Sequence, residues 1–124
     1  MTRADVLSEE MVAKLAAAGC YDLFFGVESG NERIRDEVIE KRITNEEIRN
    51  AVELCRKYGI HTNLFLLVGF PSETMEEIED TVNIGVVLNA DMIGIHNTVP
   101  FPGTEIFRYA VKEGMMPGDL IDRF

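Results

Sequence analysis

The sequence predicts an α/β fold in which parallel strands alternate with helices. Short runs of aromatic and branched apolar residues alternate with segments that carry apolar residues at helical spacing. The longest apolar run, Leu64 to Val68, belongs to a segment typical of a parallel strand that helices cover on both faces. The order is helix, strand, helix, helix, strand, helix, strand, helix, so we expect parallel βα units in a single domain over residues 1–124.

The first part of the chain is expected to form a helix, a strand and a second helix. A helix over 8–18 begins at Ser8, whose side chain can cap it, and ends at Gly19. The aromatic and apolar run over 21–27 favours a strand. Residues 31–39 carry apolar side chains on one helical face.

Two capping boxes predict the starts of two further helices. In each box a threonine is followed three residues later by a glutamate, and each side chain can bind the other residue's backbone N–H. The pairs are Thr44 with Glu47 and Thr74 with Glu77. Gly59 is expected to end the first of these helices.

The remaining elements are two strands and a last helix. Strands are expected over 61–68, buried on both faces, and over 91–99, where Gly94 interrupts the apolar pattern. A helix is expected over 104–113, and residues 114–124 form a tail with little structural information.

Composition excludes several classes of function. The chain carries 22 acidic against 12 basic residues, a net charge of −10. Nucleic acids and anionic membranes require clustered Lys and Arg, so neither is expected as a partner. The longest apolar run is also far too short to cross a bilayer.

The cysteines and histidines do not indicate a metal site. Cys20 and Cys55 lie far apart in the sequence, which is neither a metal-ligand spacing nor a disulfide framework, and we expect both to be reduced in the core of a cytoplasmic protein. His61 and His96 lie in or beside predicted strands, where a structural histidine is the expected interpretation.

Function is expected at the three strand exits, GVESG, VGFPSET and VPFPGT. In parallel α/β folds, ligands bind at the carboxyl ends of the strands. Glu28 could accept hydrogen bonds from ribose hydroxyls, the backbone at Gly69 and Phe70 could bind a base edge, and Phe70 or Phe101 could stack on the base. Glycine and proline are also ordinary constituents of βα loops, so the residue types leave a structural interpretation open.

The sequence resembles the second half of the radical S-adenosylmethionine (SAM) barrel, in particular iron–sulfur oxidoreductases and subfamilies with a cobalamin-binding domain. Five stretches carry the resemblance, in the family's order and spacing: TRAD with the following AGC, FFGVESGNERI, EKRITNEEIRNAVELCRKYGI, LFLLVGFPSETMEEIEDTV and PFPGTEIFRYAVKEG. The resemblance implies strands four to six of a TIM-like partial (β/α)6 barrel, which is half of that barrel.

The resemblance also implies roles for individual residues. GVESG resembles the motif of the fourth strand, so Glu28 and Ser29 would contact the ribose or the amino-acid part of SAM. Lys41 in EKRIT occupies a basic position that meets the cofactor carboxylate, and Arg42 is the neighbouring candidate.

Two further motifs would bind the adenine end. VGFPSE resembles the motif of the fifth strand, in which backbone near Val68, Gly69 and Phe70 contacts adenine and the acid is Glu73, four residues after Gly69. PFPGT resembles the loop after the sixth strand, near adenine and substrate, and supplies Pro100 and Phe101.

One motif of the family is absent. The CxxxCxxC loop, whose thiolates hold a [4Fe–4S] cluster with one open iron, does not occur in this sequence. The resemblance therefore implies that SAM and the cluster serve a parent protein, and that this chain neither holds the cluster nor catalyses a reaction alone.

Three interpretations of function remain. The chain is a fragment of a radical SAM enzyme that contributes adenosine-binding and substrate-side loops, a nucleotide-binding α/β module without catalysis, or an assembly domain. No Walker loop or GxGxxG supports the second. Three parallel strands leave open edges and an exposed face, so the rest of a parent barrel, or a second chain in a homodimer of half barrels, is expected as partner.

Overall fold

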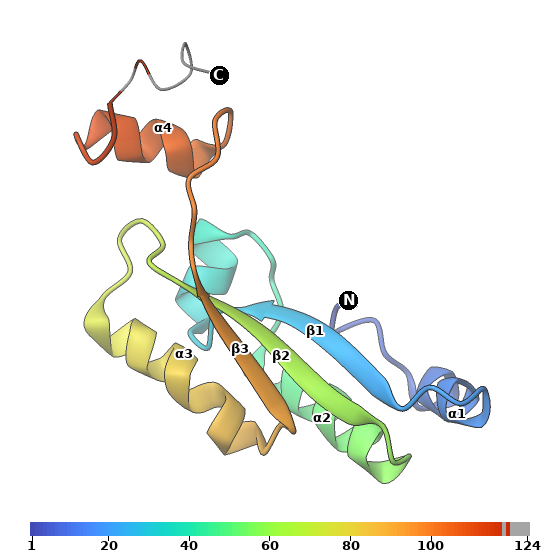
Figure 1. Ribbon diagram of the computed structural model, residues 1–124. Coiled ribbons are helices and arrows are strands. Elements are labelled where there is room, and N and C mark those ends of the chain that lie inside the picture. Colours follow the sequence, from blue (N-terminus) through green and yellow to red (C-terminus); the bar gives the residue numbers. More distant parts are fainter. Residues whose placement is uncertain (118, 120–124) are drawn as a thin grey trace.

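The computed structural model describes residues 1–117 and residue 119, and it confirms the α/β fold with parallel strands. Three strands form one sheet in the order β1-β2-β3: β1 (Asp22–Glu28), β2 (His61–Val68) and β3 (Met92–Asn97). Helices connect successive strands, which makes each connection a βα crossover (Figure 1). The part of the predicted tail over 118 and 120–124 lies outside the described residues.

Three of the described helices begin where local capping chemistry predicts. The helices are α1 (Glu9–Ala17), η1 (Ile34–Val38), α2 (Asn45–Lys57), α3 (Met75–Leu88) and α4 (Glu105–Lys112). Ser8 caps α1, and both capping boxes are formed, at Thr44 for α2 and at Thr74 for α3. Among the described residues, no helix has the length and the apolar character that a membrane span requires.

Two elements differ from the sequence expectation. The segment 31–39 is not a regular α-helix, because η1 is a π-helical turn, closed by the Ile39 N–H to the Ile34 carbonyl at 3.0 Å. The predicted strand 91–99 is shorter at both ends and pairs with β2 only from Met92 to Asn97. At its start the Asp91 carboxylate binds Thr62, and at its end β2 itself stops at Val68.

One face of the sheet carries the core. Phe25 and Val27 of β1 and Leu64 and Leu66 of β2 are almost completely buried. Helices α2 and α3 lie on this side, and α4 lies beyond the carboxyl ends of the strands (Figure 1).

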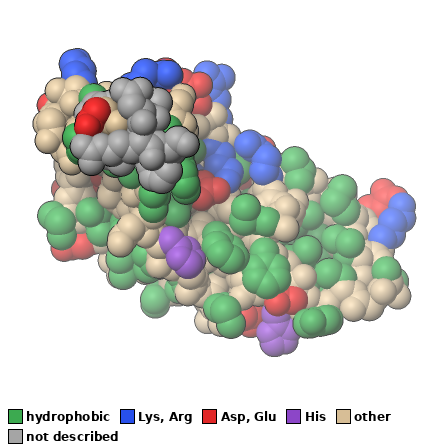
Figure 2. Space-filling view, turned by 45° about the horizontal axis from the view of Figure 1, so that its top comes forward, with side chains coloured by type: hydrophobic (Ala, Val, Ile, Leu, Met, Phe, Trp, Pro, Cys, Tyr) green, Lys and Arg blue, Asp and Glu red, His purple; other side chains and the backbone are tan. Residues whose placement is uncertain are grey.

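The other face of the sheet is open, so the prediction that residues 61–68 are buried on both faces is wrong. Side chains alternate between the two faces of a strand, and helices cover only one of them here. Phe24 on β1 is 40% exposed and Phe65 on β2 is 36% exposed. Figure 2 shows hydrophobic side chains gathered on one face of the molecule, beside the histidines. We call this surface the open face.

The free edge of β1 is partly covered by the start of the chain. Thr2 forms a parallel bridge with Phe25, and its N–H donates to the carbonyl of Phe24 at 2.7 Å. The chain before α1 thus continues the parallel order of the sheet by one bridge.

Candidate functional site

An ion pair lies at the carboxyl end of β1. The Lys41 ammonium donates to Glu28 Oε1 at 2.9 Å and also to the carbonyl oxygen of Gly26. Both side chains are largely buried, with 13% of Lys41 and 21% of Glu28 exposed. An ammonium has three donors, so Lys41 retains one for a further acceptor, and Glu28 retains its second oxygen.

A glycine in β1 makes room for this pair. The position that a Cβ atom of Gly26 would occupy lies 2.7 Å from Glu28 Oε1 and 3.1 Å from Lys41 Nζ. The strand register shifts between Gly26 and Glu28, and Glu28 adopts a φ of 71°. A left-handed conformation costs a non-glycine residue about 1–3 kcal/mol and is concentrated at functional sites. The chain thus bends at the end of β1, where the Glu28 carboxylate lies over the sheet.

The loop that carries Lys41 is anchored by Arg35, a fully buried side chain of η1. Arg35 donates to the carbonyl of Ser29 at 2.5 Å, to the carbonyl of Ile43 at 2.7 Å and to Asn45 Oδ1 at 2.5 Å. Burial lowers the pKa of the guanidinium, against the opposing effect of nearby acids. Its own carbonyl accepts from the N–H of Lys41 at 2.7 Å, so this arginine joins the exit of β1 to the segment before α2.

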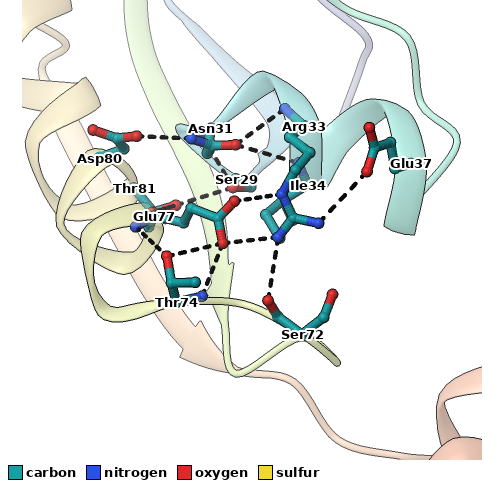
Figure 3. A network of polar contacts seen from close by, with 10 residues as sticks. All are labelled: Ser29, Asn31, Arg33, Ile34, Glu37, Ser72, Thr74, Glu77, Asp80 and Thr81. Carbon is teal, nitrogen blue, oxygen red and sulfur yellow. Dashed lines mark hydrogen bonds and ion pairs between the residues drawn. The ribbon is translucent and has the colours of Figure 1, made fainter.

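The loop after β1 is fixed on helix α3 (Figure 3). The Ser29 hydroxyl is fully buried and lies 3.0 Å from Thr81 Oγ1, which also accepts from the N–H of Gly30 at 2.9 Å. The Asn31 amide donates to Asp80 Oδ2 at 2.8 Å. No side chain fits at position 30, because a Cβ atom there would lie 2.6 Å from the backbone of α3.

An arginine joins the exits of β1 and β2 (Figure 3). Arg33 donates to both oxygens of Glu77, at 2.5 and 2.8 Å, and to the carbonyl of Ser72 at 3.2 Å. Its hydrogen bonds, together with those from Thr74, lower the pKa of Glu77 to about 2. Two loops that are distant in sequence are therefore held at one edge of the sheet.

The loop after β2 is closed by Glu73. Its Oε2 accepts from the N–H of Gly69 at 2.6 Å and from the N–H of Phe70 at 3.0 Å. Gly69 takes a φ of 88°, which only glycine adopts without strain. A cavity of about 250 Å³ lies between this loop, Pro100 and helix α4.

Two buried polar atoms at this edge have no hydrogen-bond partner among the described residues: Oε1 of Glu73 and Oγ1 of Thr98. A buried polar atom without a partner costs about 1–3 kcal/mol. Thr98 directly follows β3, and its N–H donates to the carbonyl of Val68 at 2.8 Å. Both atoms therefore keep unused hydrogen-bonding capacity at this edge of the sheet.

The structure brings together some of the residues predicted for the site. Glu28 contacts Lys41, and Gly69, Phe70, Glu73 and Pro100 line one cavity. The carbonyl of Val68 already accepts from Thr98. Arg42 and Phe101 are exposed, and Arg42 has no hydrogen bond or ion pair with the described residues.

Two predicted residues use their groups within the protein. The Ser29 hydroxyl faces Thr81 and the N–H of Asn31 rather than solvent. The ring of Phe70 is 7% exposed, so it packs inside the loop instead of presenting a face for stacking.

Sequence reasoning missed residues whose role depends on the fold. Arg35 was expected only as part of a helix, and Thr98 only as part of a strand. His61 and His96 were expected to be satisfied structural histidines, but both are exposed. His61 Nδ1 lies 3.8 Å from Asp91 Oδ1 at the start of β2, whereas His96 stacks on Phe65.

The described part of the chain contains no group of three His, Cys, Asp or Glu side chains that could hold a metal. Cys20 and Cys55 are free thiols, one partly and one fully buried, and burial raises the pKa of Cys55 to about 11. The family's motif holds a [4Fe–4S] cluster with three thiolates, and the described residues offer only these two separate thiols, so they do not fit the cluster.

Comparisons with known proteins identify the family. The model of the Radical SAM superfamily matches residues 1–84. An uncharacterized methyltransferase of Pyrococcus horikoshii is 32% identical over 115 residues, which is 93% of this chain and 25% of the relative. Cytidylyl-2-hydroxyethylphosphonate methyltransferase of Streptomyces wedmorensis is 24% identical over 116 residues, which is 89% of this chain and 22% of the relative. The chain spans about a quarter of the length of these relatives.

The fold agrees with solved structures of radical SAM proteins. The methyltransferase TsrM of Kitasatospora setae, with cobalamin and a [4Fe–4S] cluster bound, superposes with a TM-score of 0.78 at 26% identity, over 94% of this chain and 24% of that chain. Coproporphyrinogen III oxidase of Escherichia coli gives a TM-score of 0.74 at 24% identity, over 82% and 23%. These proteins share the TIM-like partial barrel, and this chain belongs to the radical SAM superfamily.

Proposed function

We propose that this chain supplies the SAM-binding half of a radical SAM barrel, whose parent protein is an enzyme of the methyltransferase type. The observation that carries the proposal is the Glu28–Lys41 pair, held at the carboxyl edge of the sheet with partly free hydrogen-bonding capacity. A zwitterionic amino-acid group needs one cation and one anion side by side, and this pair offers both.

The residues around the pair fit the rest of the cofactor. Lys41 would bind the carboxylate, with exposed Arg42 as the neighbouring cation, and Glu28 would accept from the amino group or a ribose hydroxyl. The N–H groups of Gly69 and Phe70 are occupied by Glu73, so the adenine contact at this loop would come through the carbonyl of Gly69.

The adenine end would lie toward the cavity beside α4. Pro100 lines that cavity, and Phe101, which is exposed, would lie on the substrate side. The unpartnered atoms of Glu73 and Thr98 supply further polar contacts. The fit is thus distributed over the exits of all three strands.

In this proposal another part of the parent protein holds the [4Fe–4S] cluster. No described residues fit it, so the chain alone binds SAM without reacting and needs the remaining part of a barrel. Methyl transfer is the proposed reaction class, because the relatives in the sequence comparison include named methyltransferases.

A second candidate, an assembly domain, is favoured by the open face. Phe24 and Phe65 are exposed there, and the far edge of β3 has no neighbour among the described strands. In this alternative two chains pair as half barrels. A monomer in light scattering at micromolar concentration would exclude it.

Calorimetric titration with S-adenosylhomocysteine tests the first proposal, because this compound keeps the adenosine, amino and carboxylate groups of SAM. We expect binding that Lys41→Met weakens about 10- to 150-fold, the loss of one charge-assisted hydrogen bond of about 1.5–3 kcal/mol. Lys57→Met is the control, at an exposed lysine that pairs with Glu9 at the far end of α2 from the Lys41 loop. Equal affinity of the Lys41 and Lys57 variants would contradict the proposal.

A further inference from the structure

A row of three residues crosses the middle of the open face. Gly26 of β1 pairs with Phe65 of β2, and Phe65 pairs with Gly94 of β3. The ring of Phe65 is therefore flanked by two positions without side chains. Neighbouring strands lie about 4.8 Å apart, so the two glycines are separated by roughly 10 Å.

Polar side-chain groups occupy the space above each glycine. Above Gly26 lie the Glu28 carboxylate and the Lys41 ammonium. Above Gly94 lies the imidazole of His96, whose Nε2 is 3.2 Å from the position that a Cβ atom would take. An aromatic ring thus has an ion pair on one side and an imidazole on the other.

The imidazole of His96 stacks on Phe65. Its ring is nearly parallel to that of Phe65, at 11° with centroids 5.8 Å apart, and Phe24 extends the row at 5.9 Å. Its nitrogen atoms make no hydrogen bond with the described residues. An exposed imidazole that keeps a free acceptor beside an aromatic ring is suited to bind a ligand.

We propose that the row Gly26, Phe65 and Gly94 is the floor of a substrate site for a flat, conjugated group that carries a hydrogen-bond donor. The flat group lies across the exposed part of Phe65 and donates a hydrogen bond to a nitrogen atom of His96. That this is the substrate side rests on the proposed function, which assigns the Glu28–Lys41 pair across the row to the cofactor. Packing this face against an apolar surface would remove water from the ionisable groups on both sides of the ring, which is costly, so apolar packing alone does not explain the arrangement.

NMR of the histidine ring signals tests the proposal on the 124-residue chain, with phenol as the probe and fluorobenzene as a flat ring without a donor. We expect phenol to shift the signals of His96 and to leave those of His61 unchanged, because His61 lies at the other end of the sheet beside Asp91. Phenol should bind about 3- to 10-fold more tightly than fluorobenzene.

Two variants locate the effect. His96→Phe should abolish the preference for phenol while keeping the flat surface, and His61→Phe should leave the preference unchanged. Equal shifts at both histidines, no shift at His96, or a preference that survives His96→Phe would overturn the assignment. Signals of His96 that depend on protein concentration but not on phenol would also overturn it, because the face would then pack against a second chain.

The test separates this proposal from the proposed function. Lys41→Met should lose affinity for S-adenosylhomocysteine and keep the response of His96 to phenol. A chain that responds to phenol but does not bind S-adenosylhomocysteine has the ring site without the cofactor site. A chain that binds S-adenosylhomocysteine but does not respond to phenol has the cofactor site without the ring site, which refutes only the ring site.

Discussion

A methyl group at position 26 is expected to weaken cofactor binding and to leave the fold intact. The added Cβ would lie 2.7 Å from Glu28 Oε1 and 3.1 Å from Lys41 Nζ, closer than the van der Waals distance to the first. Both atoms are the far ends of flexible side chains, so they move and the backbone does not. Gly26→Ala should therefore change the free energy of unfolding by less than about 1 kcal/mol.

The cost appears in ligand binding. A displaced ammonium no longer meets the cofactor carboxylate, and the loss of that charge-assisted hydrogen bond, about 1.5–3 kcal/mol, raises the Kd about 10- to 150-fold. Calorimetry with S-adenosylhomocysteine measures this change, and thermal unfolding checks the fold. Adenosine, which lacks the carboxylate, should bind Gly26→Ala as it binds the original chain.

Gly94→Ala is the matched control on the other side of Phe65. Its Cβ would meet only the imidazole of His96, at 3.2 Å, and leaves the Glu28–Lys41 pair untouched. Affinity for S-adenosylhomocysteine should therefore be unchanged. If Gly26→Ala binds S-adenosylhomocysteine normally, or loses adenosine to the same extent, the pair does not hold the carboxylate and the reasoning is refuted.

Further predictions concern the loop after β1. Ser29→Ala should lower the free energy of unfolding by about 1–3 kcal/mol, because Thr81 and the N–H of Asn31 lose a buried partner, and should leave the affinity for S-adenosylhomocysteine unchanged; a large loss of affinity without destabilisation in urea would show a direct ligand contact. Gly30→Ala should cost about 3 kcal/mol or more, because its Cβ meets the backbone of α3, and a melting temperature equal to that of the original chain would refute this. The pKa of Glu77 is about 2 against an ordinary 4.5, so its ionised carboxylate stabilises the fold fully above pH 4.5 and progressively less as the pH falls from about 4.5 towards 2. Glu77→Gln should reduce this pH dependence of the free energy of unfolding, and an unchanged acid unfolding curve would contradict the assignment.

Much of the fold follows from local chemistry and could be predicted. Thr44 and Thr74 begin helices because their partners in the capping box are only three residues away. The bounds of β2 also agree with the predicted strand 61–68, which lies between Gly59 and Gly69. Motif order placed Glu28 and Lys41 in one site, and they are in contact.

The rest depends on residues that only the fold brings together. Arg35 has the sequence appearance of an exposed helical arginine, yet it is buried because two loop carbonyls and an amide surround it. Ser29 lies in a motif expected to bind ligand, but Thr81, far away in sequence, takes its hydroxyl. The roles of Gly26 and Gly94 appear only in the strand register.

The most direct test of the account is a crystal structure of the chain with S-adenosylhomocysteine. We predict the ligand carboxylate within hydrogen-bond distance of Lys41 Nζ, and the adenine beside the Gly69 loop and Pro100. A ligand bound on another surface, or a site in which Lys41 and Glu28 contact only each other at saturating ligand, would contradict the central claim.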